Sequence, residues 1–190
     1  MSDLGFGFYT PEVLEHFQRP HNAVPVKNPD AVGEVGNIAC GDMMRMTIKV
    51  KRELPKPEMG DVEGLGMKKS EAGREAKELE ELVITEIGFQ TYGCAAAIAT
   101  SSITTDLALG KNFKEALEIT KDQVVKSLTK LPPSKVHCSI LAVDALGEAI
   151  YQYLTARKIE VPEALMKRHE HVEKAQKILE ERYREWSGGE

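Results

Sequence analysis

Residues 82–109 read LVITEIGFQTYGCAAAIATSSITTDLAL, and their hydrophobic period changes partway along. Residues 82–92 are rich in β-branched and aromatic side chains, which are typical of a strand. From Ala95 the pattern favours a helix, and Gly110 is a residue that can end it. This stretch therefore predicts a strand that passes directly into a helix at Cys94.

Two further strands are predicted earlier in the chain, over residues 32–37 and 43–50. In the second, apolar side chains recur at alternate positions, the period of a half-buried strand: Met44, Met46, Ile48 and Val50. The same period in residues 82–92 predicts one face with Val83, Thr85 and Ile87 and an opposite face with Ile84 and Glu86.

Helices are predicted on either side of the strands. Thr10 and Pro11 favour one helix start, and Asn112 can cap another short helix. The expected helices cover residues 10–18, 95–109, 112–119, 121–129 and a last segment from 134 or 137 to 154. Strands followed by helices are the layout of an α+β domain. The predicted fold is a small three-stranded antiparallel sheet with helices packed on one face.

Two segments are interpreted as additions to this domain. Residues 51–81 carry seven Lys or Arg and nine Asp or Glu, a composition typical of a mobile, solvated insertion, with a helical end at 70–81. Residues 162–186 form a predicted amphipathic helix with one apolar seam: Leu165, Val172, Ala175, Leu179, Tyr183 and Trp186. We therefore expect one domain over residues 1–158 and a helical extension over residues 159–190, through which the chain can form a homo-oligomer.

The composition narrows the class of function. The chain has 190 residues and a net charge of -5, and its basic residues are mixed with acidic ones, which argues against nucleic-acid binding. No run of about 20 apolar residues predicts a membrane span. Residues 1–10 lack the pattern of a secretory signal, which favours a cytoplasmic protein. Three widely spaced cysteines do not indicate a disulfide framework.

Two of the cysteines lie at junctions between predicted elements. Cys40 lies in a turn between two strands, where Gly41 lets the backbone fold tightly and Asp42 follows closely. Cys94 lies at a helix start, where the helix dipole and free N–H groups lower the pKa of a thiol. Taken singly, each is more simply interpreted as a buried thiol.

Cys138 directly follows His137 near the start of the last helix of the domain. A lone histidine is more often a surface or core residue than a metal ligand. Together, however, the three cysteines with Asp42 and His137 form a candidate ligand set for zinc, copper(I) or an iron–sulfur cluster. Permanent clusters are normally held by four cysteines, so a shell closed by Asp42 or His137 predicts a cluster that can leave.

A cysteine hydrolase is a poor alternative. Neighbouring residues on a helix point about 100° apart, so His137 and Cys138 do not face each other. Neither a Gln-Ala-Cys nor a Cys-Gly-Ser-Cys nucleophile signature is present. The chain is therefore not expected to be an enzyme.

Four motifs, in this order, resemble the IscU-type iron–sulfur cluster scaffolds and the N-terminal domain of NifU. They are YTPEVLEHFQRPHN at 9–22, ACGD at 39–42, FQTYGCAAAIA at 89–99 and LPPSKVHCSILA at 131–142. The resemblance covers about residues 9–155. It implies a protein on which a [2Fe-2S] cluster is built, held transiently and passed on.

The resemblance also implies roles for individual residues. Cys40, Cys94 and Cys138 match the cluster-binding cysteines of the family, and Cys138 is the candidate acceptor of persulfide sulfur. Asp42 matches the aspartate whose replacement makes clusters persist. His137 matches the histidine beside the third cysteine. In relatives these groups also bind zinc when no cluster is present.

The implied partners are a cysteine desulfurase, a source of iron, a ferredoxin-type electron donor and apo-protein acceptors. Leu131–Lys135 matches the segment read by a dedicated chaperone, with Ser134 where relatives usually have valine. A zinc-bound sulfur relay of the SufU type is the alternative. That branch has an insertion between its second and third cysteines and lacks the histidine, whereas this chain has its additions at 51–81 and after 158.

Overall fold

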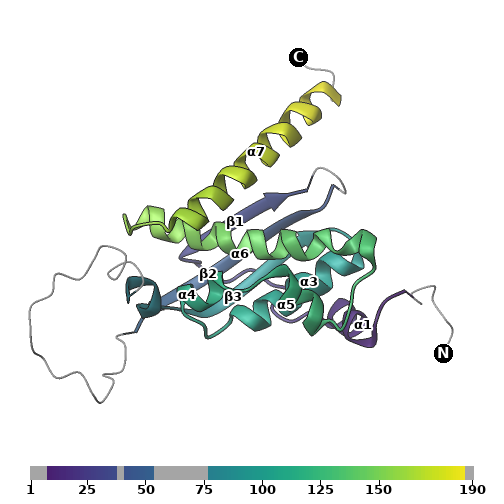
Figure 1. Cartoon of the computed structure of the whole chain (residues 1–190), viewed down its shortest axis with the longest axis horizontal. Helices are drawn as coiled ribbons and strands as arrows, with labels where there is room; N and C mark the ends of the chain where they lie inside the picture. The colour runs from purple at the N-terminus through teal and green to yellow at the C-terminus, as the bar shows by residue number, and fades with distance from the viewer. Residues whose placement is uncertain (1–7, 38–40, 54–76, 187–190) are drawn as a thin grey trace, which may run out of the picture.

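The computed structural model describes residues 8–37, 41–53 and 77–186 (Figure 1). Residues 77–81 are helical. The other elements have these bounds: α1 (Pro11–Gln18), β1 (Ala31–Gly36), β2 (Met43–Arg52), β3 (Leu82–Tyr92), α3 (Ala95–Ala108), α4 (Phe113–Leu117), α5 (Lys121–Ser127), the 3-10 turn η1 (Pro133–Lys135), α6 (His137–Ala156) and α7 (Glu163–Trp186). The predicted strands and helices are found at these places, with shifts of a few residues at their ends.

The three strands form one antiparallel sheet in the order β1-β2-β3. α6 packs against β1 and β2, and α3 packs against β3, so that both helices cover the same face (Figure 1). The side chains of β2 that contribute to the core between sheet and helices are at most 2% exposed: Met44, Met46 and Ile48. The predicted α+β class and the three-stranded antiparallel sheet are confirmed.

β3 departs from the predicted alternation at one point. The register of β2 with β3 shifts after Lys49, which leaves Thr85 as an extra residue in β3. An extra residue of this kind is a β-bulge, and it reverses the alternation of the residues beyond it. Ile84 and Ile87 consequently both lie in the core, 0% and 5% exposed. The prediction that Ile87 lies on the face opposite to Ile84 was therefore wrong.

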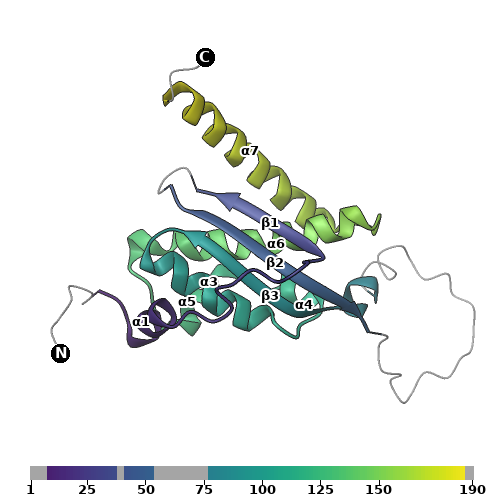
Figure 2. The same cartoon turned by 180° about the vertical axis from the view of Figure 1, so that it is seen from behind.

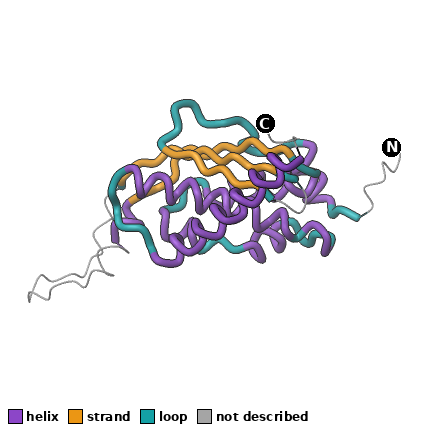
Figure 3. The backbone as a smooth tube through the Cα atoms, turned by 90° about the horizontal axis from the view of Figure 1, so that it is seen from above, coloured by secondary structure: helices purple, strands orange, loops and turns teal. Residues whose placement is uncertain are grey.

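The other face of the sheet is crossed by the irregular segment between α1 and β1, residues 19–30 (Figures 2 and 3). The amide of Val26 donates to the buried hydroxyl of Thr47, and that hydroxyl donates to the carbonyl of Gly88. A Cβ at Gly88 would lie 2.0 Å from the carbonyl oxygen of Val24, so glycine is what permits this approach. At Thr47 the sheet is thus covered on both faces.

Gly33 allows α6 to lie close to β1. A Cβ at this position would lie 2.2 Å from the carbonyl oxygen of Ala145 on α6. Ala145 and Ala149 are both fully buried, so the two elements meet through small residues. The contact fixes the position of α6, whose first turn carries Cys138.

α3 is buried along most of its length although many of its side chains carry hydroxyl groups. The hydroxyl of Ser101 donates to the carbonyl of Ala97 at 2.6 Å, and that of Thr104 donates to the carbonyl of Thr100 at 2.7 Å. Such bonds within the helix let polar side chains lie in a core without unpaired groups. The buried hydroxyl residues of α3 are these: Thr100, Ser101, Ser102, Thr104 and Thr105.

Both ends of the predicted insertion are folded onto the domain. β2 continues to Arg52, and residues 77–81 are helical. Leu79 is only 6% exposed and belongs to the main core, and Arg52 pairs with Glu81 at 3.0 Å. The remainder of the segment, residues 54–76, lies outside the described residues, so its predicted mobility stays a prediction.

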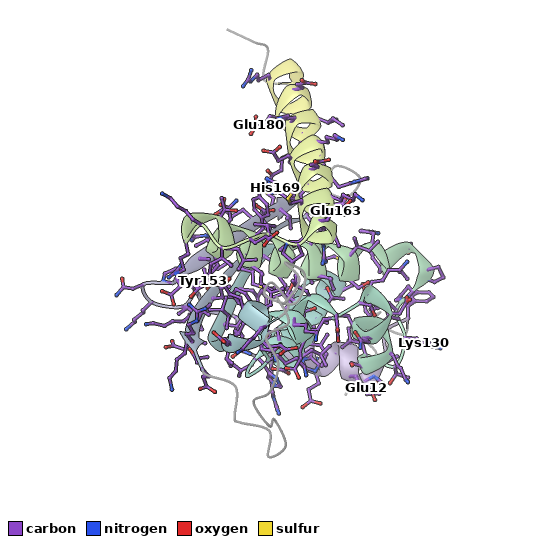
Figure 4. All side chains as sticks on the ribbon, turned by 60° about the vertical axis from the view of Figure 1, so that its left-hand side comes forward. Glu12, Lys130, Tyr153, Glu163, His169 and Glu180 are labelled. Atoms are coloured by element: carbon purple, nitrogen blue, oxygen red, sulfur yellow. The ribbon has the colours of Figure 1, made fainter. Side chains whose placement is uncertain are left out.

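α7 packs on α6 near its start and then extends away from the domain past β1 (Figure 1). At the docked end, His169 lies 2.8 Å from the carboxylate of Glu148 and stacks on the ring of Tyr151. Figure 4 shows Glu163 and His169 beside the domain and Glu180 further along the projecting helix.

The predicted apolar seam of α7 packs partly on the chain's own domain. Leu165 and Val172 are buried, and Leu179 lies against Gly36. The helix itself is confirmed over Glu163–Trp186. The side chains of Tyr183 and Trp186 lie outside the described residues, and the predicted homo-oligomer stays a prediction.

Within the described part of the chain, no helix has both the length and the apolar character that a membrane span requires. The predicted cytoplasmic location stays a prediction.

Candidate functional site

Three potential ligands that are far apart in the sequence meet at the N-terminal end of α3. The Sγ atom of Cys94 lies 3.8 Å from Sγ of Cys138, and Sγ of Cys138 lies 3.8 Å from Oδ2 of Asp42. One ligand atom of each residue lies within 4.8 Å of the ligand atoms of the other two. Cys138 and Asp42 are buried, whereas Cys94 is partly exposed. We call these three residues the thiol site.

Two helix starts and one turn bring these side chains together. Cys94 is the N-cap residue of α3, and Cys138 is the second residue of α6. Asp42 lies just before β2, where its carbonyl accepts a hydrogen bond from the amide of Asn37 at 2.9 Å. Gly41 adopts a φ of 72°, a left-handed conformation that favours glycine. Each of the three ligands is therefore positioned by a local feature of the sequence, either a helix start or the turn at Gly41.

Gly93 leaves the space that the carboxylate of Asp42 occupies. A Cβ at Gly93 would lie 2.9 Å from Cγ of Asp42 and 2.9 Å from Cβ of Ala97. A larger residue would displace either the carboxylate or the first turn of α3. Gly93 was not predicted to be part of the site, although it directly precedes Cys94 in the sequence.

The pKa of the Cys94 thiol is lowered to about 5. The largest cause is the hydrogen bond that the thiol of Cys138 donates to Cys94. The amides of Ala97 and Ala96 and the charge of Lys135 lower the pKa further, while partial burial raises it. These amides belong to the first turn of α3, where N–H groups are free to bind an anion. Cys94 is consequently a thiolate at neutral pH.

Lys135, predicted only as part of a chaperone-binding segment, is a neighbour of the thiol site. It lies in η1, directly before α6. The negative charge of Cys94 is the largest cause that raises the pKa of Lys135, and Asp42 contributes in the same direction. A positive charge beside these acidic groups offsets part of their repulsion. Lys135 and Cys94 are far apart in the sequence, so their proximity could be recognised only in the folded chain.

The structure describes only one of the two other predicted ligands. His137 is absent from the converging group, and its Nε2 atom is buried without a hydrogen-bond partner among the described residues. A buried ring nitrogen is rarely left in that state. Cys40 lies outside the described residues, although Gly41 and Asp42 beside it are described. The roles of His137 and Cys40 therefore stay predictions.

Two sulfur atoms and one carboxylate oxygen are donors that suit a soft or borderline metal. Tetrahedral zinc accepts such a set, and so does the iron of a cluster. The ionised Cys94 is ready to bind without first losing a proton to solvent, because its thiolate is already the stable form at neutral pH.

The sequence matches a known family and named relatives. The family model of the NifU-like N terminal domain matches residues 8–72 and 55–160. The chain is 43% identical over 145 residues to iron-sulfur cluster assembly scaffold protein IscU 1 of Archaeoglobus fulgidus, a match that covers 76% of each protein. It is 35% identical over 153 residues to scaffold protein IscU of Escherichia coli strain K12, which covers 79% of this chain and 97% of that protein.

A solved structure supports the fold. The crystal structure of a protein from Fervidobacterium islandicum AW-1, described as an iron-sulfur cluster assembly scaffold for the SUF system, has a TM-score of 0.51 at 18% identity. The match covers 75% of this chain and 96% of that chain. At this level of identity the likeness concerns the fold alone.

Proposed function

Since this chain belongs to the NifU-like N-terminal domain family, we propose that it is a scaffold of the IscU type, on which a [2Fe-2S] cluster is assembled and from which the cluster passes to other proteins. The observation that carries the proposal is the convergence of Cys94, Cys138 and Asp42. The cluster is cargo that the protein holds and gives away, and the protein is not an enzyme.

The proposed shell contains Cys40, Cys94 and Cys138, with Asp42 as the fourth ligand and His137 as its alternative. Stable [2Fe-2S] clusters are normally held by four thiolates. A carboxylate is a harder donor and binds iron in such a cluster less tightly than a thiolate does. The oxygen ligand is therefore the position at which an acceptor protein's thiolate can enter.

Sulfur is proposed to arrive as a persulfide on a cysteine desulfurase. A scaffold thiolate attacks the outer sulfur, the S–S bond of the donor breaks, and the donor cysteine leaves as a thiolate. Cys138 is the proposed final acceptor, but its side chain is 0% exposed, so transfer requires the site to open. Cys94 is ionised and partly exposed, and it is the thiolate that an incoming persulfide meets first.

Assembly of the cluster also needs electrons. Each of the two outer sulfur atoms must gain two electrons to become sulfide. Two ferrous ions that become ferric supply two of these four electrons. The other two must come from a separate donor, for which a protein of the ferredoxin type is the proposed source.

Exposed apolar side chains flank the thiol site and suit the docking of partner proteins. Tyr92 is 84% exposed and Met43 is 58% exposed, and the two pair across β3 and β2. Aromatic and methionine side chains are enriched at protein interfaces. Pro133 and Ser134 of the chaperone-like segment are exposed as well. We therefore propose that the desulfurase, the acceptors and a chaperone bind at this end of the domain.

Anaerobic reconstitution tests the proposal. The full chain is isolated without oxygen and supplied with ferric iron, sulfide and a thiol, and iron, sulfide and visible absorption are then measured. We expect a red-brown protein with about two iron and two sulfide per site. Cys94→Ser and Cys138→Ser should lose most of this absorption. His171→Gln, which removes an exposed histidine on α7, is the matched control and should keep it. Full cluster yield in both cysteine variants would show that the site is misassigned.

A zinc-bound sulfur relay is the second candidate, because two thiolates and a carboxylate also suit tetrahedral zinc. It predicts a colourless protein that retains zinc, accepts persulfide and takes up no cluster under the same conditions. That result would overturn the scaffold proposal while leaving the thiol site as a metal site.

A further inference from the structure

Two imidazoles and one carboxylate form a second group at the opposite end of α3. His16 lies in the last turn of α1, His21 lies in the segment that follows, and Asp106 lies near the end of α3. One ligand atom of each lies within 4.8 Å of the ligand atoms of the other two. The two imidazole rings have their centroids 4.9 Å apart.

Hydrogen bonds hold both rings in place and leave nitrogen atoms available. Nδ1 of His21 lies 2.6 Å from Oδ2 of Asp106. Because a carboxylate accepts, Nδ1 of His21 donates this hydrogen bond, and an ion bound by both atoms takes the place of the proton between them. Nδ1 of His16 lies 2.8 Å from Oγ of the buried Ser102, which also accepts from the backbone amide of His21. Metal-binding histidines are oriented in this way, by a hydrogen bond at one ring nitrogen.

The charges around this group favour a cation. The C-terminal ends of α1 and α3 both lie here, and such ends carry partial negative charge. The last turn of α3 holds no basic residue. Asp106 adds a full negative charge, and the charge of Glu15 also acts on His16.

We propose that His16, His21 and Asp106 bind a divalent first-row transition-metal ion. Imidazole and carboxylate are the ligands that zinc, ferrous iron and nickel share. The side chains of His21 and Asp106 are 53% and 32% exposed, so an ion can enter from solvent and water can complete its coordination.

This site is separate from the thiol site. Asp106 follows Cys94 by twelve residues along α3, which corresponds to about 18 Å at the rise of an α-helix. No residue is shared between the two groups. The proposal therefore does not depend on the scaffold function.

Cobalt(II) titration of the full, reduced, metal-free chain tests the proposal. Cobalt bound to thiolates gives sulfur-to-metal charge-transfer absorption, whereas cobalt bound to nitrogen and oxygen gives only weak visible bands. We expect the chain to bind one cobalt ion with charge transfer and a further ion without it. His21→Gln and Asp106→Asn should each lose the ion without charge transfer and keep the charge-transfer band unchanged.

His171→Gln is the matched control, because it removes an exposed histidine outside the group and should bind as the parent does. The ring resonances of His16 and His21 should also move when zinc is added in excess of the thiol site. If His21→Gln and Asp106→Asn bind as much cobalt as the parent, and the ring resonances stay in place, the group is only a brace between α1 and α3 and the proposal is wrong.

Discussion

The two ends of α3 present groups of potential ligands with opposite character. At the N-terminal end, Cys94 and Cys138 offer sulfur, and free amides stabilise the Cys94 thiolate. At the C-terminal end, His16 and His21 offer nitrogen beside the carboxylate of Asp106. The sulfur end is largely buried and the imidazole end is largely exposed.

With the roles proposed above, one helix would keep two metal chemistries apart. The positive end of the helix dipole favours anionic ligands such as thiolates, and the negative end favours the bound cation itself. Ligand softness adds a second distinction, because thiolates select thiophilic metals and imidazole with carboxylate selects borderline ones. Burial adds a third, since a labile cluster needs shelter whereas an exchanging ion needs access to water.

The largest expected effect is on zinc affinity at the sulfur end. Loss of a hydrogen-bonded neighbour of a metal ligand costs 10- to 100-fold in affinity, so removal of a direct ligand in Cys138→Ser should cost at least about 100-fold. Competition with a chromophoric chelator measures it. His21→Gln should leave this affinity unchanged. An equal loss in His21→Gln would show that the two ends act as one site.

Asp42→Ala should slow the loss of a reconstituted cluster to an apo-acceptor, because the family resemblance implies that replacement of this aspartate makes clusters persist. The decay of the cluster's visible absorption during transfer measures the rate. Asp122→Ala, an exposed change on α5, is the control. A rate equal to that of the parent would show that Asp42 has no role in release.

The ionisation of Cys94 should be visible in its reactivity. Its folded pKa of about 5 lies below that of an ordinary thiol, so alkylation of the metal-free chain should fall about tenfold between pH 6 and pH 4. Because the folded pKa is the lower one, the ionised form stabilises the folded chain fully above the unfolded pKa. This stabilisation is lost as the pH falls through about 5.

Peptide mass spectrometry after timed iodoacetamide pulses follows Cys94 by itself. Lys135→Met should raise the pH at which alkylation of Cys94 is half-maximal, because it removes a positive charge that lowers the pKa of Cys94. A midpoint in the parent near the ordinary value of about 8.5 would remove the electrostatic contrast between the two ends.

The smallest expected effect is on folding at the imidazole end. His21 and Asp106 are partly exposed, and such pairs contribute about 0–1 kcal/mol, so His21→Gln should lower the free energy of unfolding by less than about 1 kcal/mol. Urea denaturation of the metal-free chain measures it. A loss well above this range would mean that the group is chiefly a structural brace.

The sequence predicted most of the fold because its signals were local. The change of period at Cys94 and the caps at Thr10 and Asn112 each lie within a few residues of the element that they define. The bulge at Thr85 was missed because a strict period of two has no place for an extra residue. Only the pairing with β2 reveals it.

The convergence of Cys94, Cys138 and Asp42 could be anticipated because each lies at a recognisable junction, a helix start or the turn at Gly41. Lys135 could not, since its charge acts on Cys94 through space. The imidazole group was missed for the same reason. His21 and Asp106 are 85 residues apart in the chain, and no local spacing relates them. Such a group emerges only when α1 packs on α3.

Gly33 and Gly88 set a limit on how this family member can evolve. Side chains at these positions would meet the backbone oxygens of Ala145 and Val24 at 2.2 Å and 2.0 Å, and backbone cannot yield as a flexible side chain does. In a library of variants selected only for solubility, with no demand for metal or cluster, both positions should still return glycine. Glycine at these two positions would therefore be required by the packing of the backbone, and its presence would say nothing about metal or cluster binding.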